Sequence, residues 1–424
     1  MIESVLVILV SLVFYAKFNV RKVRALILCT VSTFIYWQFV GLYCLLLPFI
    51  ATVTWLICLL INKHKPHGNV LITIYIELLA VSFLIFKMEM VPIYLPVGFS
   101  ILCFSGISLV VDYSKKRFSI SFLDIYVFLS FFPKILAGPI ERFGKFIPQL
   151  QADVTINKIY RGCKIILLCI FAKYIIVEFL TTTRTSDVYG INQVIDIFVF
   201  AAQFYLDFWA YSNLAIGIAL LFGINLSVNF NKPYRAGSFH DFWHRWNITL
   251  SIWLRDYLYI PLGGSRDGFP RYAVNVLIVF IVSAFWHDIA LTFLLWGAIH
   301  AFLLIAERKL NLSKSKNIAY SVLVVIISAS LWQLFRCNSL DEISSIISNA
   351  SIYQEIQAYS LISLAVSVLC VILIDSKFIA KTIFQEQGSK KAIINEVVLV
   401  TILGIITLLG MNLQNSSPFF YLAY

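Results

Sequence analysis

Residues 272–306 decide the fold, and they read YAVNVLIVFIVSAFWHDIALTFLLWGAIHAFLLIA. Only His287 and Asp288 separate its two apolar runs, 272–286 and 289–306. Similar runs recur along the chain, at 2–16, 25–43, 45–61, 69–86, 92–111, 158–180, 191–222, 318–335, 359–375 and 394–411. A helix of about 20 apolar residues crosses a bilayer and satisfies its own backbone hydrogen bonds, so the pattern predicts an all-α polytopic membrane protein of about eleven to thirteen spans.

The composition agrees with a membrane protein. The chain is 60% hydrophobic and 13% charged, with a mean hydropathy of +0.87, whereas a soluble domain carries about 25% charged residues. The net charge of +11 would suit nucleic-acid binding, but the Lys and Arg residues lie in short loops beside apolar runs, as the positive-inside rule requires. The eight cysteines include no CxxC pair, so we expect neither a metal site nor a disulfide framework, and expect them to pack as small apolar side chains.

Charge also predicts the orientation. The run 2–16 follows no basic region and precedes no small-residue cleavage site, so we expect a retained helix. Basic loops are expected in the cytoplasm, which places both termini outside. They contain Lys17, Arg21, Lys22, Arg24, Lys63, Lys65, Lys115, Lys116, Arg117, Arg308, Lys309, Lys314, Lys316, Lys377, Lys381, Lys390 and Lys391. Successive loops then alternate between the two membrane faces only if 112–157 and 223–271 stay on the cytoplasmic side as interfacial or re-entrant segments. We expect 336–358 to be an outer loop with a short amphipathic helix.

The stretch Asn229–Arg271 is the least lipid-like part of the chain. It contains Phe242-Trp243-His244-Arg245-Trp246-Asn247, in which His244 and Asn247 are three residues apart and would share one face of a helix. Trp243 and Trp246 form a second pair at the same interval. An interfacial loop with an aromatic belt is the alternative, but such a loop does not need this spacing, which favours a functional site.

His287 is the candidate general base. The 15 residues of the run 272–286 rise only about 22 Å, less than the roughly 30 Å of a hydrocarbon core, so we expect His287 and Asp288 at membrane depth. A neutral imidazole can take a proton from a hydroxyl. Asp288 either orients His287 or caps the next helix, and capping is slightly favoured. For His300, structural packing or an interhelical hydrogen bond is favoured.

Three blocks resemble the membrane-bound O-acyltransferase family. They are FFPKILAGPI at 131–140, FWHRWNITLSIWLRDYLYIPLGGSR at 242–266 and SAFWHDIALTFLLWGAIH at 283–300. Leu334-Phe335-Arg336 and Ser417-Pro418-Phe419-Phe420-Tyr421 are similar to the bacterial alginate O-acetyltransferase branch. The resemblance runs from about residue 90 to the end of the chain, and its blocks occur in the family's order.

The resemblance implies a ring of helices with a central tunnel that meets both membrane faces. It implies one membrane-embedded domain over 1–424, with N-terminal helices in 1–111 and the catalytic region in 112–424. It also implies acyl transfer to a hydroxyl with His287 as the essential histidine. In the bacterial branch the acyl group enters from the cytoplasm and reaches an envelope polymer outside, often with a partner acetylase.

Three positions depart from the bacterial branch. That branch has His where this chain has Asn247, Arg where it has His244, and Gly where it has Asp288. Asn247 cannot be a base, so its amide can only position a donor or stabilise an oxyanion. His244 could compensate one turn earlier.

Our hypothesis is therefore an O-acetyltransferase of a cell-surface polysaccharide, located in the bacterial inner membrane. Acetyl-CoA is the expected donor, no cofactor is bound, and the partners are membrane lipid and a polysaccharide or acetylase outside, not nucleic acid. The expected catalytic residues are His287 and Asn247. The expected supporting residues are His244, Trp243, Trp246, Trp286 and Asp256. The residues expected to bind the donor phosphates are Lys232, Arg235, Arg245, Arg255 and Arg266.

Other functions remain open. The same blocks serve D-alanyl transfer to teichoic acid and acylation of lipid or protein hydroxyls, although Pro261-Leu262-Gly263-Gly264 is more similar to the polysaccharide-acetylating branch. A transporter or flippase also has broken helices with polar groups near the midplane, but usually shows internal repeats, and none is visible here. A non-catalytic scaffold for a soluble acetylase is suggested by the missing histidine at Asn247.

Overall fold

The computed structural model describes residues 2–64, 68–88, 96–182, 188–314, 317–376 and 379. Every regular element in these ranges is a helix, which confirms the all-α prediction. Several predicted features lie outside the described residues, namely the run 394–411, the segment 417–421 and the loop residues Lys65, Lys316, Lys377, Lys381, Lys390 and Lys391.

Long apolar helices make this a multi-pass membrane protein. Among the described residues, six helical segments are long and apolar enough to cross a bilayer. They are Arg21–Lys63, Gly68–Lys87, Gly190–Leu221, Gly268–His287, Leu291–Lys309 and Ile318–Arg336. The runs near 2–16, 92–111, 158–180 and 359–375 also form helices, namely α1 (Ile2–Lys17), α5 (Phe99–Lys116), α9 (Ile156–Phe171) and α19 (Ala358–Ile374). The count of eleven to thirteen spans stays a prediction.

Residue contacts divide the chain into two compact units. Unit 1 is Met1–Cys163 with Leu214–Ser227, and unit 2 is Lys164–Asn213 with Val228–Tyr424. Both α9 and α11 (Gly190–Leu221) contribute residues to each unit.

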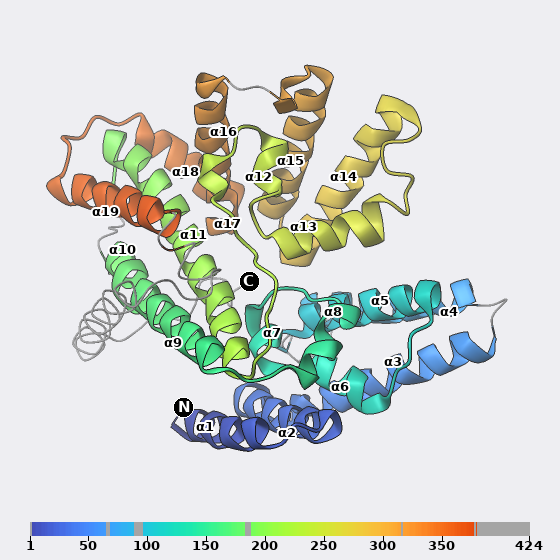
Figure 1. Cartoon of the computed structure of the whole chain (residues 1–424). Coiled ribbons are helices and arrows are strands. Elements are labelled where there is room, and N and C mark those ends of the chain that lie inside the picture. The colour runs from blue at the N-terminus through green and yellow to red at the C-terminus, as the bar shows by residue number, and fades with distance from the viewer. Residues whose placement is uncertain are drawn as a thin grey trace. The chain divides into compact units, whose positions relative to one another are not determined.

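Unit 1 contains the N-terminal helices. After α1 come α2 (Arg21–Val40), η1 (Gly41–Leu45), α3 (Leu46–Lys63), α4 (Gly68–Lys87) and α5 (Figure 1). Between α5 and α9, the segment 112–157, expected to be interfacial or re-entrant, contains only short helices, namely α6 (Phe122–Ser130), α7 (Phe132–Ala137), α8 (Phe143–Phe146) and η3 (Ile147–Gln151). Buried Arg24 ties this segment to the N-terminal helices, because its guanidinium donates to the carbonyls of Leu150 and Ala152 at 3.2 and 2.9 Å.

Unit 2 carries the remaining elements. They are η4 (Ala172–Val177), α10 (Glu178–Thr182), most of α11, η5 (Pro233–Arg235), α12 (Phe239–Trp243), α13 (Ile248–Leu254), η6 (Arg255–Tyr259), α14 (Gly268–His287), α15 (Leu291–Lys309), η7 (Leu312–Lys314), α16 (Ile318–Leu331), α17 (Gln333–Arg336), α18 (Leu340–Ala350) and α19 (Figure 1). The expected amphipathic helix in 336–358 is α18, whose N-cap Ser339 accepts a hydrogen bond from the backbone N–H of Glu342. The segment 223–271, also expected to be interfacial or re-entrant, contains only short helices before α14.

Helices α14 and α15 pack closely against each other (Figure 1). Gly297 of α15 permits this approach, because a Cβ there would lie 2.7 Å from the carbonyl oxygen of Phe280 and 3.1 Å from the Cβ of Ala284. Small residues at such crossings are typical of helix packing in membranes.

Two predictions about the junction between α14 and α15 are wrong. Helix α14 has 20 residues and a length of about 30 Å, since it begins at Gly268 and not at 272, so it is not too short to span a bilayer. The helix does end at His287, as expected. Asp288 does not cap α15, whose N-cap is Ala290; its Oδ1 instead accepts from the backbone N–H of Ile289 at 2.8 Å.

Candidate active site

The segment between α12 and α13 shapes the site. Helix α12 ends at Trp243, and Asn247, with φ 41° and ψ 55°, stands as the left-handed N-cap of α13. The prediction that His244 and Asn247 share a helical face is therefore wrong, because the helix is interrupted between them. Asparagine is among the few non-glycine residues that adopt this conformation readily. The backbone N–H of Ile248 donates to the carbonyl of Asn229 at 2.9 Å, which fixes the start of α13.

Trp243 and Trp246 contact different aromatic side chains. Trp246 is 3% exposed and packs against two aromatic rings, with centroid distances of 4.5 Å to the tilted ring of Trp332 and 5.9 Å to the nearly parallel ring of Phe204. Trp243 instead meets Trp296 and His300 edge to face at 5.6 and 5.0 Å. Each tryptophan thus attaches the interrupted segment to a different set of helices.

His287 lies within an aromatic enclosure. The centroid of its ring lies 4.8 Å from that of Phe335 on α17 and 5.6 Å from that of Trp296 on α15, both edge to face. It lies 6.2 Å from the ring of Phe293, to which it is nearly parallel, and 4.3 Å from its neighbour Trp286. The imidazole is partly exposed and therefore accessible from the adjoining cavity.

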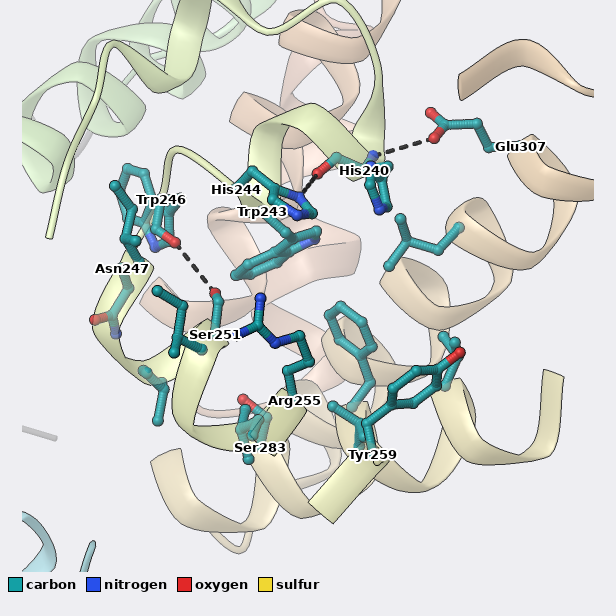
Figure 2. A pocket seen from close by; sticks show the side chains of 18 of the residues that line it. His240, Trp243, His244, Trp246, Asn247, Ser251, Arg255, Tyr259, Ser283 and Glu307 are labelled. Carbon is teal, nitrogen blue, oxygen red and sulfur yellow. Dashed lines mark hydrogen bonds between the residues drawn. The ribbon is translucent and has the colours of Figure 1, made fainter. Parts of the chain in front are cut away.

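A cavity of about 810 Å³ in unit 2 brings the candidate residues together. Its aromatic lining includes Phe204, Phe208, Trp243, Trp246, Phe280, Trp296, Trp332 and Phe335. Its polar lining includes His240, His244, Asn247, Ser251, Arg255, Tyr259, Ser265, Ser283, His287, Glu307, Arg308, Asn311 and Ser313. Figure 2 shows Arg255 extending into the cavity, with Asn247 and Glu307 at opposite sides of the view. The volume is in the range of small-molecule and cofactor sites.

About half of the residues expected at the site line this cavity. His287, Asn247, His244, Trp243, Trp246 and Arg255 do so. Trp286, Asp256, Lys232, Arg235, Arg245 and Arg266 do not. Asp256 still lies next to it, because its carboxylate pairs with Arg255 at 2.8 Å.

Three of the cations expected to bind the donor, Lys232, Arg235 and Arg245, lie near carboxylates outside the cavity lining. Arg245 pairs with Asp241 at 2.8 Å, one helical turn away. The carboxyl of Asp375 is 3% exposed, and the positive charges of Arg235, Lys232 and Arg245 act on it. These cations therefore gather near a buried carboxyl, which sequence spacing did not indicate.

The sequence did not indicate the roles of His240, Glu307 and Arg308. Arg308 lies at the end of α15, where its guanidinium stacks over the ring of Tyr272 at 3.9 Å, and it had been assigned only to a basic loop. The one signal in the sequence for Glu307 and Arg308 is that they form a charged pair at the end of an apolar run. Most such pairs only mark a membrane boundary.

The electrostatics of α12 favour a neutral His240. Burial and the nearby His244 lower the pKa of His240 below its usual value, although Glu307 and Asp241 act against this. Burial alone would raise the pKa of Asp241, but hydrogen bonds from Arg245 and from the N–H of Gly237 lower it. An ionised Asp241 and a neutral His240 thus lie side by side on α12.

His300 belongs to the supporting core. It is 0% exposed and packs against Trp243, Trp296 and Phe280, which confirms a packing role. Within the described residues, neither ring nitrogen has a hydrogen-bond partner, so the alternative of an interhelical hydrogen bond is wrong.

The described residues contain no group of three or more His, Cys, Asp or Glu side chains that could hold a metal ion. The eight cysteines are free thiols, and all but Cys163 are buried, in agreement with the expected packing.

Comparisons with known proteins connect this site to a family. The sequence profile of the membrane-bound O-acyltransferase family matches residues 30–311. A peptidoglycan O-acetyltransferase of Helicobacter pylori is 36% identical over 245 residues, which are 53% of this chain and 46% of that protein. A probable alginate O-acetylase of Pseudomonas aeruginosa is 29% identical over 362 residues, or 80% of this chain and 68% of that protein. A teichoic acid D-alanyltransferase of Bacillus subtilis is 26% identical over 226 residues, or 49% of this chain and 57% of that protein.

The chain thus spans about half the length of the Helicobacter relative. The matched profile covers well over half of the 424 residues and contains Asn247, His287 and Arg308. The resemblance seen in the sequence is confirmed, and the chain belongs to the membrane-bound O-acyltransferase family.

Proposed function

We propose that this protein transfers an acetyl group from a thioester donor to a hydroxyl of a cell-surface polysaccharide. The observation that carries the proposal is that His287 lines the same cavity as Asn247, Arg255 and Arg308. A base, a neutral amide donor and two cations are the groups that acyl transfer from a phosphate-bearing thioester requires. Relatives named for acetylation of peptidoglycan and alginate support the substrate class.

Each residue has a defined role in the proposed step. His287 takes the proton from the acceptor hydroxyl as its oxygen attacks the thioester carbonyl carbon. The amide of Asn247 donates to the oxygen on which negative charge develops. The carbon–sulfur bond then breaks, the new ester forms, and the thiolate leaves with the proton held by His287. The atoms of this step balance among the donor, the acceptor and these side chains.

The donor would be acetyl-CoA, with its phosphates against Arg255 and Arg308. Arg308 is held over the ring of Tyr272, and Arg255 begins the π-helical turn η6, so both cations have fixed anchors at the cavity. Irregular helical turns of this kind are frequent at functional sites. This assignment replaces Lys232, Arg235, Arg245 and Arg266, which do not line the cavity.

A D-alanyl donor is the second candidate, because the Bacillus relative is a teichoic acid D-alanyltransferase. Its ammonium group would need a carboxylate. Among the described lining residues the carboxylate is Glu307, which already accepts hydrogen bonds from two backbone N–H groups and a tyrosine hydroxyl. The cavity therefore favours an uncharged acyl group.

We further propose an inner-membrane location with both termini outside and transfer from the cytoplasm outward. The support is the distribution of Lys and Arg among the loops. A tag at the N-terminus that becomes accessible only after permeabilisation of the cell membrane would refute this topology.

The test is His287→Ala in the full-length protein, purified and reconstituted in lipid. Release of coenzyme A thiol from acetyl-CoA is measured with muropeptide or oligomannuronate acceptors, and ester formation by mass spectrometry. The variant should lose activity by about 10²- to 10⁴-fold, since a positioned general base contributes on this scale. His64→Ala is the matched control, because His64 is exposed at the end of α3 and does not line the cavity. Full ester formation by a correctly inserted His287→Ala protein would refute the proposal, and a wild-type protein that releases no thiol would favour a scaffold or transporter.

A further inference from the structure

Glu307, in the last turn of α15, is a carboxylate that the proposed chemistry does not use. It is 2% exposed, although the three residues that follow it in the chain are exposed. Its Oε2 accepts from the backbone N–H of Phe239 at 2.6 Å and from the hydroxyl of Tyr320 at 2.8 Å. Its Oε1 accepts from the backbone N–H of His240 at 3.1 Å. Figure 2 shows the carboxylate facing the start of α12 at His240.

These contacts complete the N-terminus of α12. The first N–H groups of a helix have no partner within the helix, and a buried one must find an acceptor elsewhere. Ser238 Oγ accepts from the N–H of Asp241 at 3.0 Å. Glu307 serves the two preceding N–H groups, those of Phe239 and His240. A helix of only five residues thus depends on a side chain 67 positions away.

Helix α12 in turn carries the wall of the cavity. His240, Trp243 and His244 all line it. Trp243 packs on Trp296 of α15, the helix that also bears Glu307. Asn247 follows α12 after three linking residues, so a shift of α12 moves the amide relative to His287.

We infer that Glu307 is a positioning residue for the acyl transfer: it fixes α12 on α15 and α16 so that Trp243 and Asn247 stay in register with His287. The inference rests on the proposed function for its catalytic part and on the hydrogen bonds alone for its structural part. Glu307 does not touch the reacting atoms. It acts through the N-terminus of α12.

The experiment compares three variants of the full-length protein in lipid nanodiscs. Glu307→Gln keeps the shape but leaves one acceptor oxygen for two N–H groups and the hydroxyl. Tyr320→Phe removes only the hydroxyl contact. Glu342→Gln is the matched control, because Glu342 also accepts from a backbone N–H, that of Asn338 at 3.0 Å, at the exposed start of α18 and away from the cavity.

Amide hydrogen exchange measures the structural part without turnover. Glu307→Gln should speed exchange in residues 239–244 by about tenfold or more, because the N–H groups lose a charged acceptor. Tyr320→Phe should speed it by about two- to threefold, and Glu342→Gln should change only the start of α18. Unchanged exchange of 239–244 in Glu307→Gln would overturn the inference, and if that variant does not fold, unchanged exchange in Tyr320→Phe would do so.

Kinetics with acetyl-CoA measure the catalytic part. We expect kcat of Glu307→Gln to fall about tenfold or more while the KM for acetyl-CoA stays within about twofold, since Arg255 and Arg308 lie outside α12. A second measurement follows the pKa of His240 by NMR of ¹³C-labelled histidine. This pKa should fall further in Glu307→Gln, because the negative charge of Glu307 raises it in the wild type. The other charged or titratable neighbours, His244, Asp241 and Arg308, are unchanged in the variant. A merely destabilised protein would not show this local shift.

The two hypotheses fail in different ways. If His287→Ala retains activity, the proposed function fails, whereas the exchange result for Glu307 still stands. If His287→Ala is inactive and Glu307→Gln has normal kcat with faster exchange, only the positioning role fails.

Discussion

The ring of His287, at the end of α14, lies edge to face against the ring of Phe335 on α17, with centroids 4.8 Å apart. Phe335 is 2% exposed and also contacts Trp296 and Trp332. A residue 48 positions away therefore sets one wall around the candidate base.

Phe335→Leu tests this wall. Aromatic pairs contribute about 0.5–1.5 kcal/mol beyond burial, so we expect kcat to fall about two- to tenfold while the protein stays folded. The acyl-transfer rate and the thermal midpoint in detergent are measured together. A rate equal to wild type would show that the enclosure does not orient His287.

Asn247→Gly separates backbone from side chain. Glycine adopts the positive φ of this position without strain, so α13 should keep its start while the amide is lost. Loss of one oxyanion donor costs about 10²–10³ in kcat. Asn247→Ala should lose the same activity and about 1 kcal/mol of stability in addition, because alanine is strained there. Normal turnover by the glycine variant would remove Asn247 from the mechanism.

Arg255→Gln and Arg308→Gln should each raise the KM for acetyl-CoA about tenfold, because each removes a charge-assisted contact to phosphate. The control is Arg266→Gln, since Arg266 is exposed and does not line the cavity. The effect should shrink as salt rises, because salt screens exposed charges. Equal KM values for all three variants would place the donor phosphates elsewhere.

Acid should destabilise the protein in part through His240. Burial and His244 lower its pKa from 6.5, so below that pH the unfolded chain binds more protons at this position than the folded chain does. Stability therefore decreases as pH falls through 6.5, with Glu307 and Asp241 opposing and Arg308 reinforcing the shift. The thermal midpoint of His240→Gln should fall less steeply between about pH 7 and 5 than that of wild type. If the thermal midpoints of wild type and His240→Gln fall equally with pH, His240 does not destabilise the protein in acid.

Gly297→Ala should destabilise the packing of α14 on α15 by about 1–3 kcal/mol, because the added Cβ meets the Phe280 carbonyl at 2.7 Å. Gly144→Ala is the control, as a Cβ there has no neighbour within 4 Å. Thermal unfolding in detergent gives both values. Equal thermal midpoints for the two variants would show that the added Cβ at position 297 does not weaken the packing of α14 on α15.

The helices were predictable from the sequence, and so was the polar character of the segment 229–271. Apolar run length determines where a membrane helix forms, since its hydrogen bonds are local and lipid offers no other partner. The end of α14 at His287 follows from the same pattern. The start of α14 at Gly268 does not, because Gly268-Phe269-Pro270-Arg271 precedes the apolar run and yet belongs to the helix.

The sequence by itself determined an all-helical membrane protein and its family, and it predicted His287 and Asn247 as the candidate catalytic residues. Only the tertiary structure decided what surrounds them. The left-handed turn at Asn247, the Phe335 wall, the position of Arg255 and Arg308 at the cavity, and the Glu307 contact all depend on packing between helices that are distant in sequence. Local hydrogen bonds specify a helix residue by residue, whereas a cavity is specified by side chains from several helices at once, and spacing along the chain does not reveal which of them meet.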